Sequence, residues 1–393
     1  MKNINGYVFN ENDKHATASA YWWKSKKGMT DYFFKQFKEP KRPSPRVSEA
    51  VRAQRTEECD SFAAERRKVL SSLRTLVGGN IIAPVEYFEH EGRFYQATEW
   101  REISHENVSA CTQAEKELIL KTAATNLKVI HDKKLIHLDL KPDNMPVIVN
   151  PISKKKVSAL MDFDDSHFEG AMPPPKEAAG TDPYKSPEFA AYCMKDNSYG
   201  NVVTTKNDIF ALAIVFHEYW TGRKFIYKGS DDKKNGRYLY QAVDNNEEIR
   251  VAPGVPDWLE GILRQMIKKN PDERPTAAEV LEWLNDHSKI PGKTSDETHE
   301  DTHKTEDTHK TENTHKTENT HKTEDTHKTE DTHKTEDKTR PIPHNFVKGP
   351  NFPPEAIDFV IHQDKNNVVI ISNGSRRGYA LDIAIRKGII KRA

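Results

Sequence analysis

Eight consecutive residues, and an aspartate at a set distance after them, constrain this chain more than any other feature. The octapeptide is His137-Leu138-Asp139-Leu140-Lys141-Pro142-Asp143-Asn144, and Asp162-Phe163 begins eighteen positions after Asn144. Asp139 can accept or orient the proton of an attacking hydroxyl group, and Lys141 can neutralise charge on a phosphoryl group in transfer. Asn144 and Asp162 can hold a metal ion that bridges phosphates. Together they supply the polar groups that phosphoryl transfer requires.

The same residue types also favour turns and helix caps, so each of them could have a purely structural role. Turn chemistry does not require Asp139, Asn144 and Asp162 to stand at these mutual spacings. The agreement of all three spacings therefore favours a phosphoryl-transfer site.

The octapeptide resembles the catalytic loop of the eukaryotic-type protein kinase family, which reads H-R-D-L-K-P-x-N. The resemblance implies an α+β, bilobal fold over residues 5–289, with a small β-rich N-lobe and a larger α-helical C-lobe. It also implies ATP as the phosphoryl donor, Mg²⁺ or Mn²⁺ as the metal ion and a protein hydroxyl group as the acceptor. Lys141, two residues after Asp139, is similar to the serine/threonine branch of the family.

The hydrophobic pattern of residues 1–289 fits this order of lobes. Alternating or aromatic runs predict strands, and apolar residues three to four apart predict helices. The apolar run from Asp208 to Trp220 predicts a buried central helix. Strands are predicted at residues 7–10, 18–24, 31–37, 85–88 and 94–97, and helices at residues 57–76, 115–131, 208–220 and within 256–284.

In this family a strand lysine binds the α- and β-phosphates of ATP and is held by a glutamate from the N-lobe helix. The resemblance assigns these roles to Lys35, in the run YFFKQF, and to Glu65, in the run FAAE. Taken singly, each could be an ordinary solvated side chain. The resemblance also places the hinge after Thr98, where backbone groups of Glu99 and Trp100 would meet the adenine.

Three positions depart from the family pattern. The segment NENDKHATASAYW contains no glycine where the family has a glycine-rich phosphate loop, so its backbone would approach a phosphate less closely. Leu138 replaces the arginine of H-R-D, which predicts independence from activation-segment phosphorylation. Asp164 replaces the glycine of D-F-G, which limits backbone flipping and adds a carboxylate near the metal-binding residues.

The segment from Asp162 to Glu188 resembles a kinase activation segment, because GTDPYKSPE is similar to G-T-x-x-Y-x-A-P-E. The resemblance places Thr181 beside Asp139 and Lys141, pairs Glu188 with Arg274, and has Asp208 hold the catalytic-loop backbone. Small-molecule kinases such as aminoglycoside phosphotransferases generally lack this segment and its arginine partner. A protein substrate is therefore favoured.

Composition limits the location and the partners. Lys+Arg and Asp+Glu both number 60, so no overall charge points to nucleic acid or membrane. Cys59, Cys111 and Cys193 are scattered without C-x-x-C spacing, which is typical of a reducing compartment without structural zinc. The N-terminus has no apolar signal-peptide core, and no apolar run is long enough to span a bilayer. We expect a cytoplasmic protein without membrane association.

Residues 290–340 are of low complexity and contain six consecutive hexamers, each THKTED or THKTEN, from Thr302 to Asp337. The hexamers have no apolar residue that could offset the entropy of folding. They predict a flexible tether with a root-mean-square span of roughly 40 Å. The alternative is metal capture by the histidine that recurs every six residues.

Residues 341–393 regain apolar residues and predict a small α/β module. We expect a helix after Pro353-Pro354, a strand at NVVIIS, a turn at Asn373-Gly374 and a helix from Arg377 to Lys391. The module could dock a partner, self-associate or fold back on the kinase domain. Its basic tail leaves nucleic-acid binding as the minority alternative.

The sequence favours a serine/threonine protein kinase that also phosphorylates itself, at Thr181, Tyr184 or the threonines of the repeats. The divergent N-lobe and exact repeats resemble kinases carried by bacteria and their phages, some of which act in phage exclusion. A pseudokinase scaffold is one alternative, supported by the three departures, and tyrosine or dual specificity is another. The intact set of Lys35, Glu65, Asp139 and Asp162 argues against the scaffold.

Overall fold

The computed structural model describes residues 1–291, apart from His105, Asn201 and residues 232–235, together with the backbone of five strands between residues 346 and 392. The chain divides into two compact units, Met1–Asp301 and Thr302–Ala393, which are described separately. The predicted tether, with its histidines, lies outside the described residues apart from its first two positions.

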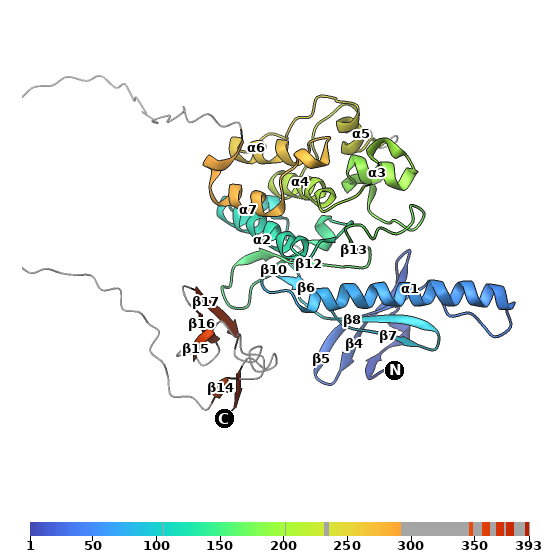
Figure 1. The fold of residues 1–393 in the computed structure, drawn as a ribbon. Helices are drawn as coiled ribbons and strands as arrows, with labels where there is room; N and C mark the ends of the chain where they lie inside the picture. The colour runs from blue at the N-terminus through green and yellow to red at the C-terminus, as the bar shows by residue number, and fades with distance from the viewer. Residues whose placement is uncertain are drawn as a thin grey trace, which may run out of the picture. The chain divides into compact units, whose positions relative to one another are not determined.

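The first unit begins with a seven-stranded antiparallel sheet in the order β1-β2-β4-β5-β8-β7, with β3 paired to β4 (Figure 1). Tyr7, Phe34 and Tyr95 stack on one face, and the rings of Tyr7 and Phe34 lie 4.9 Å apart. Burial of these aromatic side chains makes this face a core of its own. The strands are β1 Lys2–Ile4, β2 Tyr7–Phe9, β3 His15–Ala16, β4 Ala20–Lys27, β5 Thr30–Phe37, β7 Pro84–His90 and β8 Arg93–Glu99.

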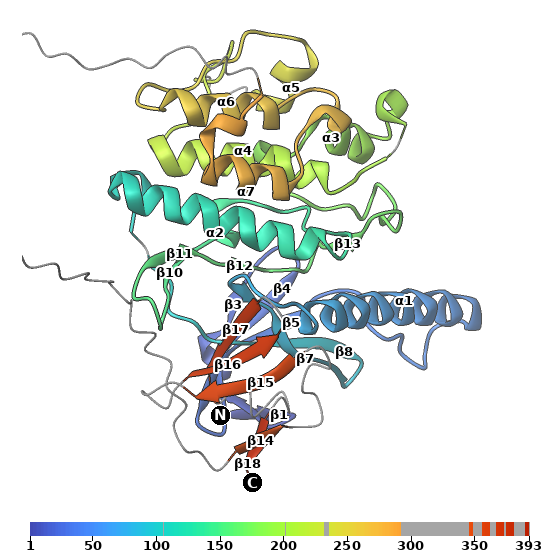
Figure 2. The ribbon, with the colours of Figure 1, turned by 60° about the vertical axis from the view of Figure 1, so that its left-hand side comes forward.

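Helix α1, Glu49–Arg74, lies along this sheet (Figures 1 and 2). Its buried residues recur every three or four positions from Cys59 to Leu73, which gives one face that packs under the sheet. The helix starts eight residues before the predicted position 57. Residues 49–58 expose almost all their side chains, so they carry no apolar period, but Glu, Ala, Arg and Gln favour a helix by propensity.

A helical region follows the sheet and is built around α4, Lys206–Thr221. Every residue of α4 from Asn207 to His217 is buried, in agreement with the predicted central helix. Figure 2 shows α2, α4, α6 and α7 packed in layers, with α2 on the side of the sheet region. The other helices are α2 Gln113–His131, α3 Pro187–Met194, α5 Leu239–Asp244, α6 Asp257–Met266 and α7 Ala277–Asn285.

Short strands carry the chain into and out of the predicted catalytic loop, residues 137–144. Parallel pairing of Leu160 in β12 with Ile81 in β6 joins the loop's far side to the segment after α1. His167 in β13 pairs with Ile136 in β9, which enters the loop. These strands are β6 Ile81–Ile82, β9 Leu135–Ile136, β10 Val147–Val149, β11 Lys156–Ser158, β12 Leu160–Met161 and β13 His167–Phe168. In the part of the chain that the structure describes, no helix is long and apolar enough to cross a membrane.

The second unit contains strands where the sequence predicted two helices. The predicted strand NVVIIS is confirmed as β16, Asn367–Ser372, which pairs with β15, Ala356–Ile361, and β17, Ser375–Ala380. The helix predicted after Pro353-Pro354 and the start of the helix predicted from Arg377 are therefore wrong. An apolar strand that needs hydrogen-bonded neighbours on both sides explains the difference. A second pair joins β14, Phe346–Lys348, to β18, Ile390–Arg392, and Asn373-Gly374 lies outside the described residues.

Candidate active site

Asp208, at the start of α4, holds the backbone of the catalytic loop in place. Its fully buried carboxylate accepts hydrogen bonds from the backbone N–H of His137 at 2.7 Å and of Leu138 at 3.0 Å. Leu138 adopts a left-handed backbone conformation with φ of 66°, which leucine rarely adopts. Its side chain packs with Ile136 and Phe189 in an apolar cluster. Asp208 and this packing together fix the backbone conformation of the residues directly before Asp139.

Asp139 lies at the centre of a hydrogen-bond network. Its Oδ1 accepts from the Thr181 hydroxyl at 2.6 Å and from the Thr181 backbone N–H at 3.0 Å. Its Oδ2 accepts from Lys141 Nζ at 2.6 Å and from Asn144 Nδ2 at 2.9 Å, and Lys141 also donates to Thr181 Oγ1 at 3.0 Å. The structure therefore brings Asp139, Lys141 and Asn144 together, with Thr181 beside them as the sequence predicted.

The network keeps Asp139 ionised. Burial of the carboxyl group would raise its pKa, but hydrogen bonds from Lys141 and Thr181 outweigh burial and hold the pKa below its ordinary value. An ionised carboxylate that already accepts a hydroxyl hydrogen can orient another hydroxyl group in the same way.

Gly180 allows Thr181 to come this close. Its φ is 155°, and a Cβ atom there would lie 3.0 Å from the Leu138 carbonyl oxygen and 2.7 Å from the Phe189 ring. A larger residue would push the activation segment away from the catalytic loop. Steric hindrance thus explains why the first position of the GTDPY motif is a glycine.

His137 connects the loop to the segment that carries Asp162. The ring is fully buried, its Nε2 lies 3.0 Å from the Met161 carbonyl oxygen, and its centre lies 5.1 Å from that of Phe163. Asp162 follows with a left-handed φ of 61°, a conformation that aspartate tolerates better than most residues. This contact fixes where the Asp162 carboxylate stands relative to the loop.

The residues present fit a magnesium ion. The Nδ2 of Asn144 donates to Asp139, and no described residue donates to the Oδ1 of Asn144. In Asp162, Lys35 binds only Oδ1, at 3.0 Å. Each side chain thus keeps one oxygen for a hard cation. Within the described residues no group of three or more His, Cys, Asp or Glu side chains could hold a metal alone. A site with one carboxylate that is completed by phosphate oxygens is typical of Mg²⁺.

A cavity of about 310 Å³ lies between the sheet and the Asp162 segment. Lys35 on β5 stands directly across from Trp22 on β4 and from Gln96 on β8. Because side chains opposite one another share a face of a sheet, all three line the cavity. Its other lining residues include Ile82, Thr98, Glu99, Trp100, Met161 and Phe163.

The structure does not contain the ion pair that the sequence predicted between Lys35 and Glu65. Lys35 instead binds Asp162 at 3.0 Å and contacts a carboxylate oxygen of Asp164. Oε1 of Glu65 contacts Nδ1 of His167. The physical reason is the replacement of glycine by Asp164, which places a carboxylate within reach of Lys35. Burial would lower the pKa of Lys35, but Asp164 and Asp162 outweigh it and raise the pKa.

The hinge residues lie at the cavity, where the sequence placed them. Glu99 ends β8, and both Glu99 and Trp100 line the cavity. The backbone N–H of Trp100 already donates to the Asp31 carbonyl oxygen at 2.9 Å. This amide is therefore not free to meet an adenine ring, as the resemblance had implied for Trp100.

The glycine-free loop forms a tight hairpin between β3 and β4. The backbone N–H of Thr17 donates to the Ala20 carbonyl oxygen at 2.9 Å, and the Thr17 hydroxyl accepts from the Ala20 N–H at 3.0 Å. The His15 ring stacks on Trp22 with centres 3.9 Å apart. Polar and aromatic contacts close this turn in the absence of glycine.

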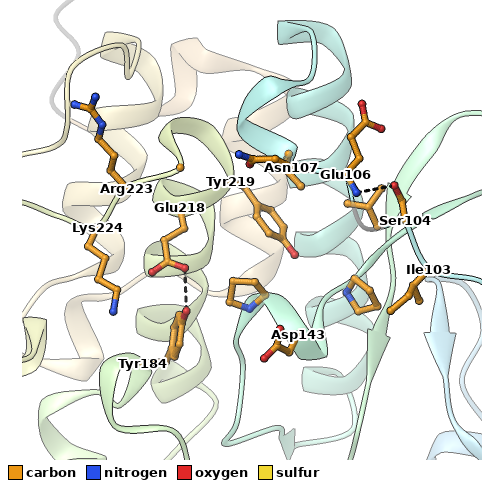
Figure 3. Close-up of a pocket in the computed structure, with 15 residues that line it drawn as sticks. Ile103, Ser104, Glu106, Asn107, Asp143, Tyr184, Glu218, Tyr219, Arg223 and Lys224 are labelled. Atoms are coloured by element: carbon orange, nitrogen blue, oxygen red, sulfur yellow. Dashed lines mark hydrogen bonds between the residues drawn. The ribbon is translucent and has the colours of Figure 1, made fainter.

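A second pocket, of about 680 Å³, lies beside the catalytic loop (Figure 3). Asp143 points into it from the loop, and Tyr184 donates to Glu218 Oε2 at 2.9 Å. Glu218 Oε1 is buried without a hydrogen-bond partner, and burial raises the pKa of this carboxyl group. The pocket thus lies next to the catalytic loop, and Ile103 lines both this pocket and the cavity at Lys35.

A buried ion pair braces the end of the activation segment. Arg274 donates to Glu188 at 2.7 and 2.9 Å, and both side chains are almost wholly excluded from solvent. The pairing agrees with the prediction. It fixes the segment after Tyr184 to the body of the helical region.

Four residues at the site were not predicted. Trp22 and Gln96 stand across from Lys35 in the sheet, Arg66 contacts the Asp164 carbonyl oxygen, and His167 contacts Glu65. The register that places Trp22 and Gln96 across from Lys35 depends on pairing between distant strands, which no local pattern reveals. Arg66 and His167 make their contacts through tertiary packing. Asp164 was noticed only as a departure from the motif, although its charge was a signal that it could bind Lys35.

Comparison with known proteins agrees with this geometry. The family model described as the protein kinase domain matches residues 47–284, more than half of the chain. A protein of Acanthamoeba polyphaga mimivirus, R436, named as a serine/threonine-protein kinase, is 31% identical over 42% of this chain and 54% of its own length. PknA of Corynebacterium glutamicum, another serine/threonine-protein kinase, is 33% identical over 40% of this chain and 30% of its own.

The mouse serine/threonine-protein kinase Nek1 is 26% identical over 57% of this chain and 18% of its own length. The chain thus spans about half or less of the length of these relatives. The family-model match begins after β5 and the glycine-free loop. The chain belongs to the protein kinase family.

Proposed function

We propose that this protein is a serine/threonine kinase that transfers the γ-phosphoryl group of ATP to hydroxyl groups of protein substrates. The observation that carries the proposal is the network at Asp139, whose Oδ1 accepts a threonine hydroxyl while Lys141 lies 2.6 Å from Oδ2. Lys141 and Thr181 in this arrangement support the serine/threonine class. The names of the relatives support the same class.

The reaction follows from these positions. The acceptor hydroxyl donates its hydrogen to Asp139 while its oxygen attacks the γ-phosphorus. The bond from the γ-phosphorus to the β–γ bridging oxygen breaks, and ADP leaves with the bond's electrons. Lys141 offsets negative charge on the group in transfer. Asn144 and Asp162 would hold the divalent ion, which neutralises phosphate charge when bound.

Lys35 would bind the nucleotide's phosphates at the other end of the cleft, with the adenine against the hinge at Glu99 and Trp100. The pocket of Figure 3 supports a polypeptide substrate, because it opens beside the catalytic loop and is lined by Asp143 and Tyr184. A chain that carries the acceptor residue needs such space on either side of it. The same arrangement supports phosphorylation of the kinase by another copy of itself.

A pseudokinase scaffold remains the second candidate, because the phosphate loop lacks glycine and Asp164 replaces the glycine of D-F-G. Its distinguishing expectation is nucleotide or partner binding without transfer.

Incubation with γ-labelled ATP, Mg²⁺ or Mn²⁺ and a generic protein substrate tests the proposal. Phosphoserine or phosphothreonine is expected in the substrate and in the kinase, and Asp162→Asn removes the label. Phosphotyrosine as the main product would overturn the specificity class. No label from folded protein with either metal would leave the scaffold as the function.

A further inference from the structure

We propose that Asp164, and not Glu65, is the residue that positions Lys35 for the phosphates of ATP. This inference rests on the proposed kinase function and names a positioning residue at the same site. It departs from the assignment that the sequence motif gave, and its basis is the set of contacts around Lys35.

Lys35 is enclosed by the groups that it binds. Its side chain is 8% exposed, and its Nζ contacts Asp164 Oδ2 and lies 3.0 Å from Asp162 Oδ1. An ammonium group has three N–H donors, so these two carboxylates leave one donor free. A phosphate oxygen in the cavity would accept a hydrogen bond from this free donor.

Asp164 is itself fixed on both sides. Its Oδ1 accepts from Gln96 Nε2 at 3.2 Å, and Gln96 stands directly across from Lys35 in the sheet. Its backbone carbonyl accepts from the Arg66 guanidinium, which also donates to Phe163 O at 3.1 Å and Ser166 O at 3.3 Å. A carboxylate held by side chain and backbone has little freedom to leave Lys35, so it can fix the Nζ position.

Glu65 is engaged elsewhere. It contacts His167 on β13, and the neighbouring Arg66 reaches three carbonyl oxygens of residues 163–166. A rotation of α1 that brought Glu65 to Lys35 would break both sets of contacts and leave the buried Arg66 charge without its acceptors. Glu65 and Arg66 thus join α1 to the activation segment, while Asp164 takes over the lysine.

The added carboxylate also suits the charges at the site. Asp162 and Asp164 together outnumber Lys35 by one negative charge, and a divalent ion held by Asp162 would reverse that balance. Asp164 would then remain as the dedicated partner of Lys35. Gln96, an uncharged donor, satisfies the second Asp164 oxygen without competing for the lysine.

Steady-state kinetics and nucleotide binding by calorimetry would test this assignment in the full-length wild type and in Asp164→Asn, Asp164→Gly and Glu65→Gln. Both Asp164 variants are expected to lose on the order of 100-fold in kcat/KM for ATP, because Lys35 is no longer held in place. Glu65→Gln is expected to stay within about threefold of wild type, since its contact lies away from Lys35.

A double substitution separates positioning from a structural role. In a Lys35→Met background, Asp164→Asn is expected to change kcat/KM by less than about threefold, because the residue acts through the lysine. Asp164→Glu is expected to recover part of the loss of Asp164→Asn. Tryptophan fluorescence reports folding of every variant, since all six tryptophans lie between residues 22 and 283.

A large loss in Glu65→Gln with wild-type activity in Asp164→Gly would overturn the proposal and return Lys35 to the helix glutamate. Equal losses from Asp164→Asn with and without Lys35 would also overturn it. If the wild type binds ATP but transfers no phosphate, the proposed function fails, and the ATP affinities of the Asp164 and Glu65 variants still decide this inference.

Discussion

The two ends of the active-site cleft are built in different ways. At the acceptor end, Asp139, Lys141 and Asn144 lie within six residues of one another and form their network largely among themselves. At the nucleotide end, Lys35 depends on Gln96 from β8 and on Asp162 and Asp164 from the activation segment.

The difference concerns how far a short motif determines geometry. Where the interacting groups are near neighbours in the chain, the motif also fixes their contacts. Where they come from three elements, one substitution can change the partners while the catalytic loop stays the same. Asp164 replaces one glycine, and Lys35 pairs with it instead of Glu65. The chain thus matches the family motif around Asp139, apart from Leu138, and departs from it in the contacts of Lys35.

The largest effect is expected from the buried ion pair that fixes the end of the activation segment. Arg274→Ala leaves the Glu188 carboxylate buried and unpaired, so we expect a loss of about 3–5 kcal/mol in the free energy of unfolding. The matched control is Arg264→Ala, whose pair with Glu260 is half exposed and should cost less than about 0.5 kcal/mol. Urea unfolding followed by tryptophan fluorescence measures both. Equal losses would show that the buried pair contributes no more than a surface pair.

The second-largest effect distinguishes the acceptor end of the cleft from the nucleotide end, because it lowers kcat and leaves the affinity for ATP nearly unchanged. Lys141→Ala should lower kcat by about 10²–10³-fold, or 2.7–4 kcal/mol, because a cation aimed at the transferred group is lost. The affinity for ATP should change little, since Lys141 does not line the nucleotide cavity. Lys133→Ala, at an exposed position, serves as the control. A rise in KM for ATP with unchanged kcat would place Lys141 at the nucleotide end.

The smallest effect concerns Asp165, whose environment includes carboxylates of both ends. Burial, followed by the charges of Asp164, Asp139 and Asp162, raises its pKa to about 6. The folded state therefore binds this proton more tightly than the unfolded state, and the stabilisation is lost as the pH rises from about 4 through 6. At pH 7 the ionised group destabilises the fold.

Asp165→Asn removes that penalty. Without metal or nucleotide, the variant should be more stable than wild type at pH 7 by about 1–2 kcal/mol, after allowance for partial exposure. The advantage should shrink at pH 4.5. Asp132→Asn, with an exposed side chain, is the control. The same difference at both pH values would contradict a raised pKa at Asp165.

The sequence predicted the acceptor end closely because its motifs there resemble those of the kinase family, which imply contacts between distant residues as well as local ones. The contacts of Asp139 with Thr181, of Asp208 with the loop and of Glu188 with Arg274 all followed from motifs. The partner of Lys35 could not be predicted, since it depends on strand register and on the position of α1. In the second unit, β16 was predicted as a strand, but the segments of β15 and β17 were misread as helices, because short segments fit either period.

In the proposed mechanism, Asp139 handles the acceptor hydroxyl while the other end of the cleft holds the nucleotide. Wild type, Asp139→Asn and the control Asp132→Asn should be compared for ATP affinity and for single-turnover phosphate transfer. We expect Asp139→Asn to bind ATP within about threefold of wild type and to lose at least about 10²-fold in transfer, the lower end of what a positioned base contributes. Transfer at the wild-type rate in Asp139→Asn would contradict it.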